Sequence, residues 1–486
     1  MRFRPRVFEL DARLDAGDLL ARLRSRRGLV ALDSAGGEPR RFSLVAFDPL
    51  RGVAVPSALV DLRALLGGLR AQSGDPVPGP FRGGFLGALS YDLGVAGERP
   101  IPVAADPWRS PRIAGGLYVD FFVRDEGCGR IWLVLGDDPG DGRPEVEVRR
   151  RKILALLDAP EDPSPTCRPT GPLVRRTPAE EHAARIGRAR ERIAAGDFYQ
   201  ANLAHRFTRS MEGNPVDLYR AIREHHPAPY MGYLAWDAQS SSGGEGFPRG
   251  AILSASPELL LEFDGELART RPIKGTAARG RTRAEDERRA RELLASPKDL
   301  AELAMIVDLE RNDLGRVCVP GSVRVERHPH LESYATVHHL SADVVGRPRP
   351  GVTAVELLAA LFPGGSVTGA PKLAAMEAIA LLEGEGRGFF TGALGFLDLG
   401  GRAAFNILIR TLVWRPGEVS FHVGGGITWS SDARAEDDET LTKGSALAAA
   451  LDGEPSGRKA ARGRPPAARP CEDPLRARGD RERSIR

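Results

Sequence analysis

Four acidic side chains stand in two pairs with the same spacing. Asp299 and Glu302 are three residues apart in "SPKDLAELAMIVDLERND", and Glu436 and Glu439 repeat that spacing in "SSDARAEDDETLTKGSALAAAL". Residues three apart on a helix project from one face. Two such faces turned toward each other would suit Mg²⁺, which prefers oxygen ligands and takes one or two protein carboxylates together with water and substrate.

Each acidic pair also has an ordinary structural explanation. Ser296 and Pro297 predict a helix start, where the helix dipole favours a carboxylate such as that of Asp299. An exposed glutamate needs no function, and Glu439 stands four residues before Lys443, the spacing of a helical ion pair worth about 0.3–0.5 kcal/mol. Spacing alone does not show that the two helices meet.

A lysine between an apolar pair and a Gly-Thr turn is a candidate nucleophile. It is Lys274 in "TRPIKGT" (270–276). A lone lysine is most often a solvated surface charge. One held beside glycine, where the backbone can approach a ligand closely, could instead attack a substrate.

Two glycine-rich stretches and one arginine could bind an anion. "PGGSVTGAPK" (363–372) lacks the Lys-Ser/Thr of a phosphate loop, yet it offers backbone N–H groups and Ser366 before a predicted helix. "VGGGITW" (423–429) is either a tight turn or a close approach of backbone to a ligand. Arg410 ends the apolar run "FNILIRTL", where it either pairs with an internal acid or holds a carboxylate.

Composition excludes several classes of protein. The chain has 486 residues and a formal charge of +4, but residues 454–486 carry ten Lys/Arg and five Asp/Glu, which leaves about −1 for the rest. A nucleic-acid-associated protein acting through this basic tail is therefore the alternative of another class, and the folded part offers no basic bias for nucleic acid. Four scattered cysteines indicate reduced thiols of a cytoplasmic protein. We expect neither a signal peptide nor a membrane span.

The chain divides into four segments. Residues 1–157 form an N-terminal subdomain with short β-like runs, 158–178 is a Pro-rich surface connection, and 179–452 alternates helices with strands. Residues 453–486 lack the apolar content for a core and are predicted to be a disordered basic tail. "ELLLEFDGELART" predicts a hairpin that turns at Asp264 and Gly265.

These pieces together resemble the chorismate-utilising enzymes, which include component I of anthranilate synthase, aminodeoxychorismate synthase, and the isochorismate and salicylate synthases. The matching stretches span 196–443 in family order. They include "GDFYQANLAHRF", "SASPELLLEF", "TRPIKGTAARG", "GGSVTGAPK" and "GGGITWSSDARAEDDETLTK". The resemblance implies an α+β fold with two large packed antiparallel β-sheets, surrounding helices, an active site between the sheets, and a requirement for Mg²⁺.

The resemblance assigns roles to matching positions. It implies that Glu302 and Glu439 hold Mg²⁺, that Asp299 and Glu436 bond its waters, and that the ion grips the ring carboxylate of chorismate. The other implied substrate contacts are Thr276 at the ring, Arg410 and the backbone of Gly424, Gly425 and Gly426 at the enolpyruvyl carboxylate, and Gly365, Ser366 and Lys443 lining the cleft. One position departs from the family, because Phe390 stands where a tyrosine is common.

Position 274 separates the branches of the family. Anthranilate synthases have alanine in the matching "PIAGT", and aminodeoxychorismate synthases have lysine, as here. The lysine branch implies addition of the Lys274 amine to chorismate, loss of the C4 hydroxyl protonated by Glu258, and entry of ammonia at C4, with His339 near that hydroxyl and His338 structural. Gln200 stands where isochorismate-type enzymes have a lysine that activates water.

The resemblance also implies a partner and a second pocket. None of the four cysteines lies in a glutaminase-like nucleophile elbow, so ammonia would come from a separate glutamine amidotransferase subunit, as part of 4-aminobenzoate and folate synthesis. Anthranilate synthase component I is the nearest alternative. Some relatives bind tryptophan in a pocket whose matching residues here are Ser34, Pro229, Tyr230 and Met231.

Overall fold

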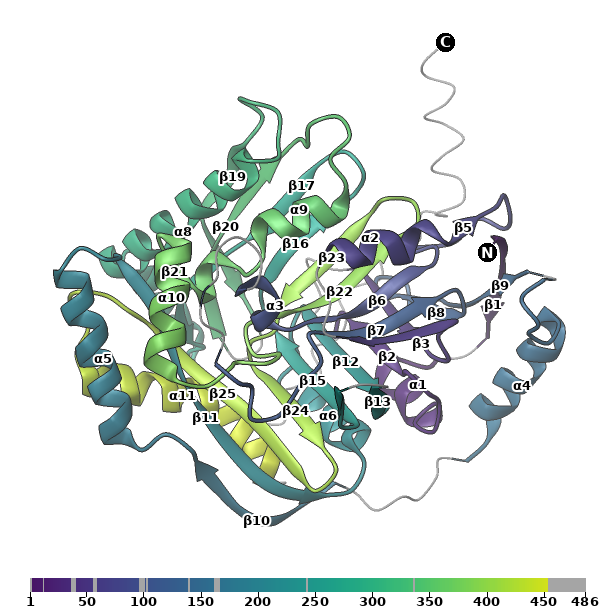
Figure 1. Ribbon diagram of the computed structural model, residues 1–486, viewed down its shortest axis with the longest axis horizontal. Helices are drawn as coiled ribbons and strands as arrows, with labels where there is room; N and C mark the ends of the chain where they lie inside the picture. Colours follow the sequence, from purple (N-terminus) through teal and green to yellow (C-terminus); the bar gives the residue numbers. More distant parts are fainter. Residues whose placement is uncertain are drawn as a thin grey trace.

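The computed structural model describes residues 2–11, 13–35, 41–55, 59–95, 101, 104–138, 140–160, 167–241, 244–334 and 337–452. The predicted tail at 453–486 lies outside these residues. Two large, mostly antiparallel sheets with helices on their outer faces make up the described part, which confirms the α+β prediction (Figure 1).

The first sheet has thirteen strands within the described residues. In spatial order they are β10 (Arg168–Arg175), β11 (Gln200–Glu212), β25 (Glu418–Ile427), β24 (Thr411–Arg415), β15 (Gly250–Ser256), β12 (Tyr230–Trp236), β2 (Val30–Asp33), β3 (Phe42–Ala46), β8 (Phe121–Asp125), β9 (Ile131–Asp137), β1 (Arg2–Leu10) and β5 (Arg70–Ala71), with β21 (Gly369–Ala370) paired to β11. The strand β10 lies where a surface connection was expected; its alternating half-exposed pattern fits an edge strand.

The second sheet has ten strands within the described residues. Their order is β18 (Ile273–Ala278), β20 (Val337–Gly346), β17 (Ala268–Arg271), β16 (Leu259–Phe263), β23 (Ala403–Ile407), β22 (Ala393–Asp398), β6 (Gly84–Leu89), β7 (Ile113–Tyr118) and β4 (Arg51–Val55), with β19 (Arg324–Ser333) paired to β20. The predicted hairpin is confirmed as β16–β17. A separate ribbon is formed by β13 (Gln239–Ser241) and β14 (Gly244–Phe247).

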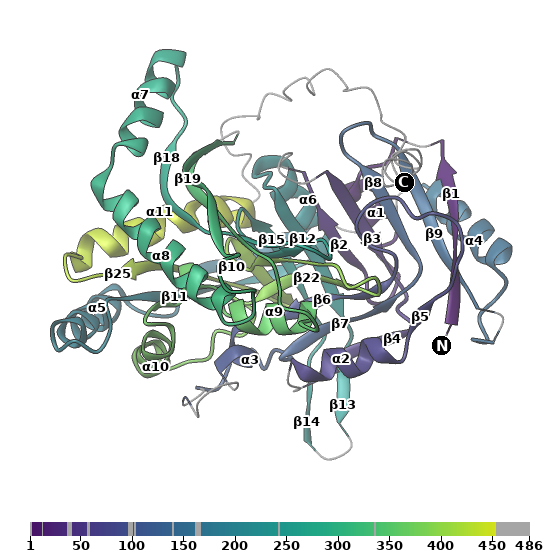
Figure 2. The ribbon, with the colours of Figure 1, turned by 90° about the horizontal axis from the view of Figure 1, so that it is seen from above.

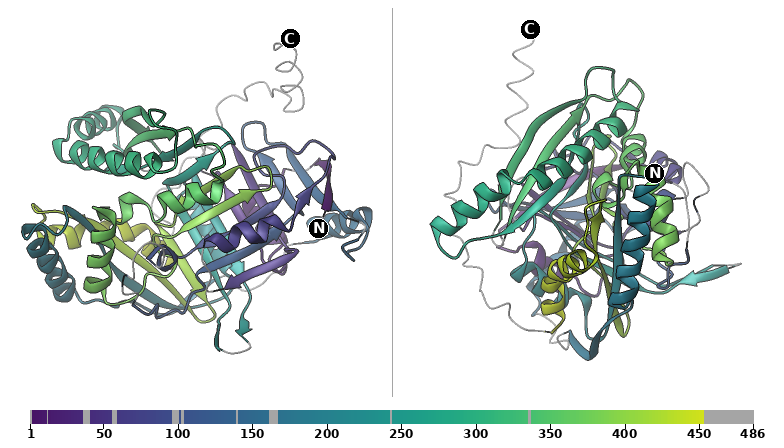
Figure 3. Two further views of the ribbon diagram at one scale, coloured as in Figure 1. Left: turned by 45° about the horizontal axis from the view of Figure 1, so that its top comes forward. Right: turned by 90° about the vertical axis from the view of Figure 1, so that its left-hand side faces the viewer.

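Helices cover the outer faces of both sheets (Figures 2 and 3). They are α1 (Ala16–Arg22), α2 (Val60–Gly67), α3 (Tyr91–Val95), α4 (Val146–Asp158), α5 (Ala179–Ala194), α6 (Pro215–His225), α7 (Arg283–Leu294), α8 (Pro297–Gly315), α9 (Ala354–Leu361), α10 (Lys372–Glu383) and α11 (Ala433–Asp452), with a short 3₁₀ helix η1 (Gly365–Val367). Both sheets contain strands from before and after residue 157, so the two segments share one pair of sheets.

Three apolar layers hold these elements together. Residues of β2, β3, β12 and β15 pack against residues of β6, β7, β22 and β23 between the sheets. The outer face of the first sheet packs against α1, α4, α6 and α11, and that of the second against α2, α8 and α9. Burying a large apolar side chain contributes about 1.5–3 kcal/mol, so these layers fix where α8 and α11 lie. In the described part of the chain, no helix is long and apolar enough to cross a membrane.

Candidate active site

A bulge in β18 brings Lys274 into the structure's interior. The register against β20 shifts between Lys274 and Thr276, at Gly275, whose φ is +73°. A side chain at Gly275 would lie 3.0 Å from atoms of Asp299, so glycine permits β18 to pack against the start of α8. The Lys274 side chain is half-buried and its Nζ donates to the Ser366 carbonyl at 3.3 Å.

Burial makes the Lys274 amine easier to deprotonate. It lowers the pKa of Lys274, and the nearby Lys443 acts in the same direction, although Glu302, Glu258 and Glu439 oppose it. Glu302 is the largest opposing group, so the amine and the carboxylates of both acidic pairs belong to one site. Lys274 is thus no solvated surface charge.

Glu258 supplies an acid beside this amine. The side chain is buried between β15 and β16, and its Oε1 accepts from the Ile273 N–H at 3.3 Å. Burial raises the pKa of Glu258 to about 7, against the opposing effects of the Ser366 hydroxyl and the Lys274 ammonium. A carboxyl group that stays protonated near neutral pH can donate a proton to a leaving group.

The two acidic pairs do converge. Ser296 caps α8, with its hydroxyl accepting from the Asp299 N–H at 3.3 Å, as predicted. Burial raises the pKa of Glu302, and both Asp299 and Glu439 add to that rise through their negative charges. Glu436 is buried on α11 and accepts from the Ser431 hydroxyl at 2.7 Å. The helices α8 and α11 lie at the same end of the molecule (Figure 2).

Lysines partly neutralise these acids. Lys298 Nζ lies 3.9 Å from Glu302, and Lys443 Nζ lies 2.8 Å from Glu439. Burial would raise the pKa of Glu439, but Lys443, Lys298 and Lys274 outweigh it and lower that pKa. Four carboxylates from two helices, with water access at Glu439, form the oxygen donor set that suits Mg²⁺.

The three glycines 424–426 lie within β25, near its C-terminal end, so the tight-turn interpretation is wrong. The N–H groups of Asn202 and Ala204 point away from β25, to the Thr368 carbonyl and to Glu383. Antiparallel alternation then directs the N–H groups of Gly424 and Gly426 to the opposite edge, beyond the last residue paired with β24.

Gly425 has a different environment from its neighbours. Its register partner is Leu203, which commits its N–H to the ladder rather than to a ligand. A side chain at Gly425 would lie 3.2 Å from Glu436 Oε2, and one at Gly426 would lie 2.6 Å from Gln200 Nε2. Glycine here lets the strand approach both the acidic helix and the cleft.

Arg410 is a half-buried cation without a partner. Its backbone has φ +50°, and its guanidinium forms no hydrogen bond or ion pair with any described residue. Burial lowers the pKa of Arg410, and only the charge of Glu258 counters it. A guanidinium in this state, near free N–H groups of β25, is suited to a carboxylate ligand.

The loop before α10 contacts both α8 and Arg387. Ser366 is buried and lies in η1, next to Gly365, where a side chain would lie 2.7 Å from Leu309 of α8. Arg387 donates to the Val367 carbonyl at 3.0 Å and pairs with Glu383. Arg387 was not predicted from the sequence; its only signal was an arginine in an otherwise apolar "RGFF" stretch.

Two neighbouring histidines on β20 differ in their hydrogen bonds. His338 is satisfied by Ser333 at 2.7 Å and Asp286 at 3.0 Å, in keeping with a structural role. His339 Nδ1 lies 2.8 Å from the exposed Thr276 hydroxyl, while its buried Nε2 has no partner among the described residues. Burial lowers the pKa of His339 to about 3, so this imidazole is neutral.

Two further positions bear on the substrate. Gln200 is fully buried, and neither of its side-chain polar atoms has a partner among the described residues. A neutral amide there cannot deprotonate water. Phe390 stacks on His422 with ring centroids 4.9 Å apart. It therefore makes an aromatic contact and offers no hydroxyl of the kind that a tyrosine at this position would provide.

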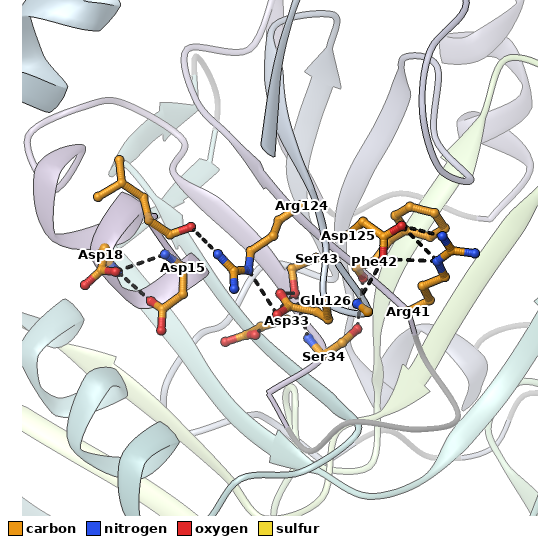
Figure 4. A network of polar contacts seen from close by, with 12 residues as sticks. Asp15, Asp18, Asp33, Ser34, Arg41, Phe42, Ser43, Arg124, Asp125 and Glu126 are labelled. Carbon is orange, nitrogen blue, oxygen red and sulfur yellow. Dashed lines mark hydrogen bonds and ion pairs between the residues drawn. The ribbon is translucent and has the colours of Figure 1, made fainter. Parts of the chain in front are cut away.

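Ser34, one residue of the predicted tryptophan pocket, lies within a network of polar contacts (Figure 4). Met231 of β12 pairs with Asp33 of β2, next to Ser34, which brings Ser34 beside Tyr230 and Pro229. The Ser34 hydroxyl donates to the Phe42 carbonyl at 2.9 Å. The Asp33 carboxylate accepts from Arg223 at 2.6 Å and Tyr219 at 3.1 Å. Residues 36–40 beside it lie outside the described part.

A second carboxyl group lies behind the site. Glu310 of α8 is buried and accepts from the Thr270 hydroxyl at 2.7 Å. Burial raises the pKa of Glu310 to about 8, with Glu258 and Asp313 adding to the rise and Thr270 and Lys372 opposing it. In the folded protein the Glu310 carboxyl group therefore stays protonated up to about pH 8, whereas an ordinary glutamate, with a pKa of 4.5, loses its proton well below that pH.

This raised pKa predicts a pH-dependent stability. A group with a raised folded pKa stabilises fully below its unfolded pKa, and the contribution is lost as the pH rises through the folded pKa. Relative to wild type, Glu310→Gln should gain about 1 kcal/mol of unfolding free energy per pH unit between about pH 5 and pH 8. Urea unfolding across that range measures it. Equal effects at all pH values, or the same trend in the exposed control Glu377→Gln, would contradict it.

One cluster outside this site resembles a metal centre. His182, His205 and Asp437 are buried together. The Thr440 hydroxyl donates to the Asp437 carbonyl, so it must accept from His205 Nε2–H at 2.8 Å, and His182 Nδ1–H donates to the Asp437 carboxylate at 2.7 Å. Arg175 also pairs with that carboxylate. His182 Nδ1 and His205 Nε2 are thus committed to hydrogen bonds and the acid is paired with Arg175, while His182 Nε2 and His205 Nδ1 have no partner among the described residues.

Comparison with known proteins identifies the family. A family model described as chorismate binding enzyme matches residues 57–449. Anthranilate synthase component 1 of Streptomyces coelicolor is 38% identical over 90% of this chain and 84% of its own length, and aminodeoxychorismate synthase component 1 of Bacillus subtilis is 33% identical over 92% and 96%. The crystal structure of anthranilate synthase component I from Streptococcus pneumoniae superposes with a TM-score of 0.71, at 29% identity over 83% of this chain and 91% of that one.

The chain belongs to the family of chorismate-binding enzymes. Its relatives divide between aminodeoxychorismate and anthranilate synthases, so family membership defines a chorismate-utilising enzyme and leaves the particular reaction to the site.

Proposed function

We propose that this chain is component I of an aminodeoxychorismate synthase, which aminates chorismate at C4. The observation that carries the proposal is Lys274: a half-buried amine with a lowered pKa, bonded to the Ser366 carbonyl and beside the protonated acid Glu258. An alanine at this position could not form a covalent bond to the ring.

Metal and substrate would be held by opposite sides of the site. Glu302 and Glu439 would hold Mg²⁺, with Asp299 and Glu436 bonding its waters, and the bound ion would neutralise the ring carboxylate of chorismate. Arg410 and the N–H groups of Gly424 and Gly426 would take the enolpyruvyl carboxylate. Two anchored carboxylates would fix the ring against Lys274.

The reaction divides a difficult displacement into two steps. The neutral Lys274 amine adds at C2, the ring double bond shifts, and the C4 hydroxyl leaves as water with a proton from Glu258. Ammonia then adds at C4, the double bond returns, and Lys274 is expelled; the Glu258 carboxylate accepts the proton that ammonia loses. The neutral His339 would orient the C4 hydroxyl through its free Nε2.

Ammonia would come from a glutamine amidotransferase subunit. The relatives' designation as component 1 implies a second component. The chain alone would use free ammonia, and glutamine would serve only when that partner is present.

Anthranilate synthase component I is the second candidate, favoured by the higher identity to the Streptomyces coelicolor relative. Incubating the purified chain with chorismate, Mg²⁺ and ammonium, followed by separation of the products and mass analysis, decides between them. We expect 4-amino-4-deoxychorismate. Fluorescent anthranilate formed without an added lyase would overturn the assignment.

The metal proposal predicts a loss of ion binding. Glu302→Gln and Glu439→Gln should each weaken Mg²⁺ binding by about tenfold or more, because each removes one charged ligand from a site that offers few. Calorimetric titration with Mg²⁺ measures this without turnover. The control Asp438→Asn removes the same charge from an exposed position beside Glu439 and should bind normally. Equal losses in all three variants would contradict specific ligation.

A further inference from the structure

A small cavity lies outside the active site, on the first sheet. It has a volume of about 30 Å³, room for about two water molecules. The elements around it are the chain between α1 and β2, the start of α6, the end of β12, the start of β15, and β24. Its polar lining residues are Arg24, Arg26, Asn214, Tyr233, Trp236, Asp237, Arg249 and Trp414. None of the predicted catalytic, metal or tryptophan-pocket residues lines it.

Hydrogen-bond donors without acceptors gather around this cavity. The Trp414 side chain is 7% exposed, and its Nε1–H is buried without a partner among the described residues. Arg26 Nε is likewise buried and unpaired, although another nitrogen of Arg26 pairs with Asp48. A buried donor left unsatisfied costs about 1–3 kcal/mol, so a ligand acceptor would recover that energy.

Three arginines and one acid line the cavity, and two of these arginines are paired with acids outside the lining. Arg249 is exposed and forms no hydrogen bond or ion pair with any described residue, while Arg24 shares its charge with Asp217 at 3.2 Å. The Asp237 side chain is the one acid among the lining residues named above, and it is exposed. Arg249 and Arg24 both act on the Tyr233 hydroxyl, which places their charges close to this wall.

The start of α6 places the positive end of a helix dipole at the cavity. Asn214 and Pro215 line the cavity, and the eleven-residue helix that begins at Pro215 directs its positive end there. Asn214 caps the Val216 N–H with its side chain at 3.0 Å, and its carbonyl accepts from the Asp217 N–H at 3.1 Å, so the helix contributes its dipole rather than free N–H groups.

We propose that this cavity, bounded by Arg24, Arg26, Arg249, Trp414 and the start of α6, binds a small oxyanion: the carboxylate or phosphate group of a small molecule. The volume admits two oxygen atoms of one such group, and the rest of the molecule extends into solvent past Arg249. The guanidiniums supply charge, and the indole N–H supplies a directed bond.

Calorimetric titration of the full chain with inorganic phosphate, and separately with acetate, tests this proposal. We expect saturable binding with a millimolar Kd at a site that depends on Arg249, and the tighter of the two probes identifies the group. Arg249→Met should weaken binding by about tenfold, since it removes an unpaired guanidinium from an exposed position where folding is unaffected. Trp414→Phe keeps an aromatic ring but removes the indole N–H, and it should weaken binding several-fold.

A matched control separates the site from general attraction to a basic surface. Arg283 on α7 is 94% exposed and far from the cavity in sequence and fold, so Arg283→Met should leave the Kd unchanged. If Trp414→Phe fails to fold, Arg249→Met and the phosphate-dependent rise in Tm of wild type carry the test. Absence of saturable binding by either anion, or equal effects of Arg283→Met and Arg249→Met, overturns the proposal.

Discussion

Lys274→Ala is expected to abolish amination of chorismate, with turnover lowered by about 10³-fold or more, as when another covalent nucleophile is removed. The other amines beside the acidic pairs, Lys298 and Lys443, are both exposed and lie next to Glu302 and Glu439, so we expect neither to replace Lys274. The KM for chorismate should change little, because the proposed substrate contacts of Arg410 and the acidic helices would remain. Steady-state kinetics with saturating ammonium and Mg²⁺ measures both values.

The control for this result is Lys152→Ala. Lys152 is exposed on α4, so its loss removes the same charge without touching the site. If Lys274→Ala kept more than a small fraction of wild-type turnover, ammonia would be attacking the ring directly and the covalent route would be wrong.

Glu258→Gln is expected to lower kcat by about 10²–10⁴-fold, the usual contribution of a general acid–base group. Glutamine keeps the shape and the acceptor for the Ile273 N–H, but it cannot donate a carboxyl proton to the departing hydroxyl. Chorismate binding should persist, which a titration monitored by calorimetry verifies.

Glu262→Gln is the matched control on the neighbouring strand. Glu262 is exposed on β16, four residues from Glu258, and its replacement should leave kcat within experimental scatter. A Glu258→Gln enzyme with normal kcat would assign the proton transfer to another group.

Local rules predicted the elements that carry the acids. The Ser296–Pro297 start of α8 and the hairpin at Asp264 follow from capping and turn chemistry that act within a few residues. The spacing of Asp299 and Glu302 predicted a shared helix face. That this face meets α11 depends on how the sheets pack, which no local pattern encodes.

Other features depended on contacts distant in the sequence. The bulge at Gly275 lies where β18 packs against α8, and the burial of Arg387 and Glu310 accompanies bonds to residues far away in the chain, Asn202 and Thr270. The sequence of glycines 424–426 is compatible with either a turn or a strand, because glycine permits both conformations. Only the pairing with β11 distinguishes Gly424 and Gly426, which face an open edge, from Gly425, which does not.

The covalent bond between Lys274 and the substrate ring is the central claim, and intact-protein mass spectrometry tests it most directly. The enzyme is mixed with chorismate and Mg²⁺ without ammonia, so that the second step cannot occur. We expect a mass increase equal to chorismate minus one water, located by peptide mapping at Lys274 and missing in Lys274→Ala. An unmodified wild-type chain under conditions where added ammonium gives rapid turnover, or an adduct that persists in Lys274→Ala, would contradict the mechanism.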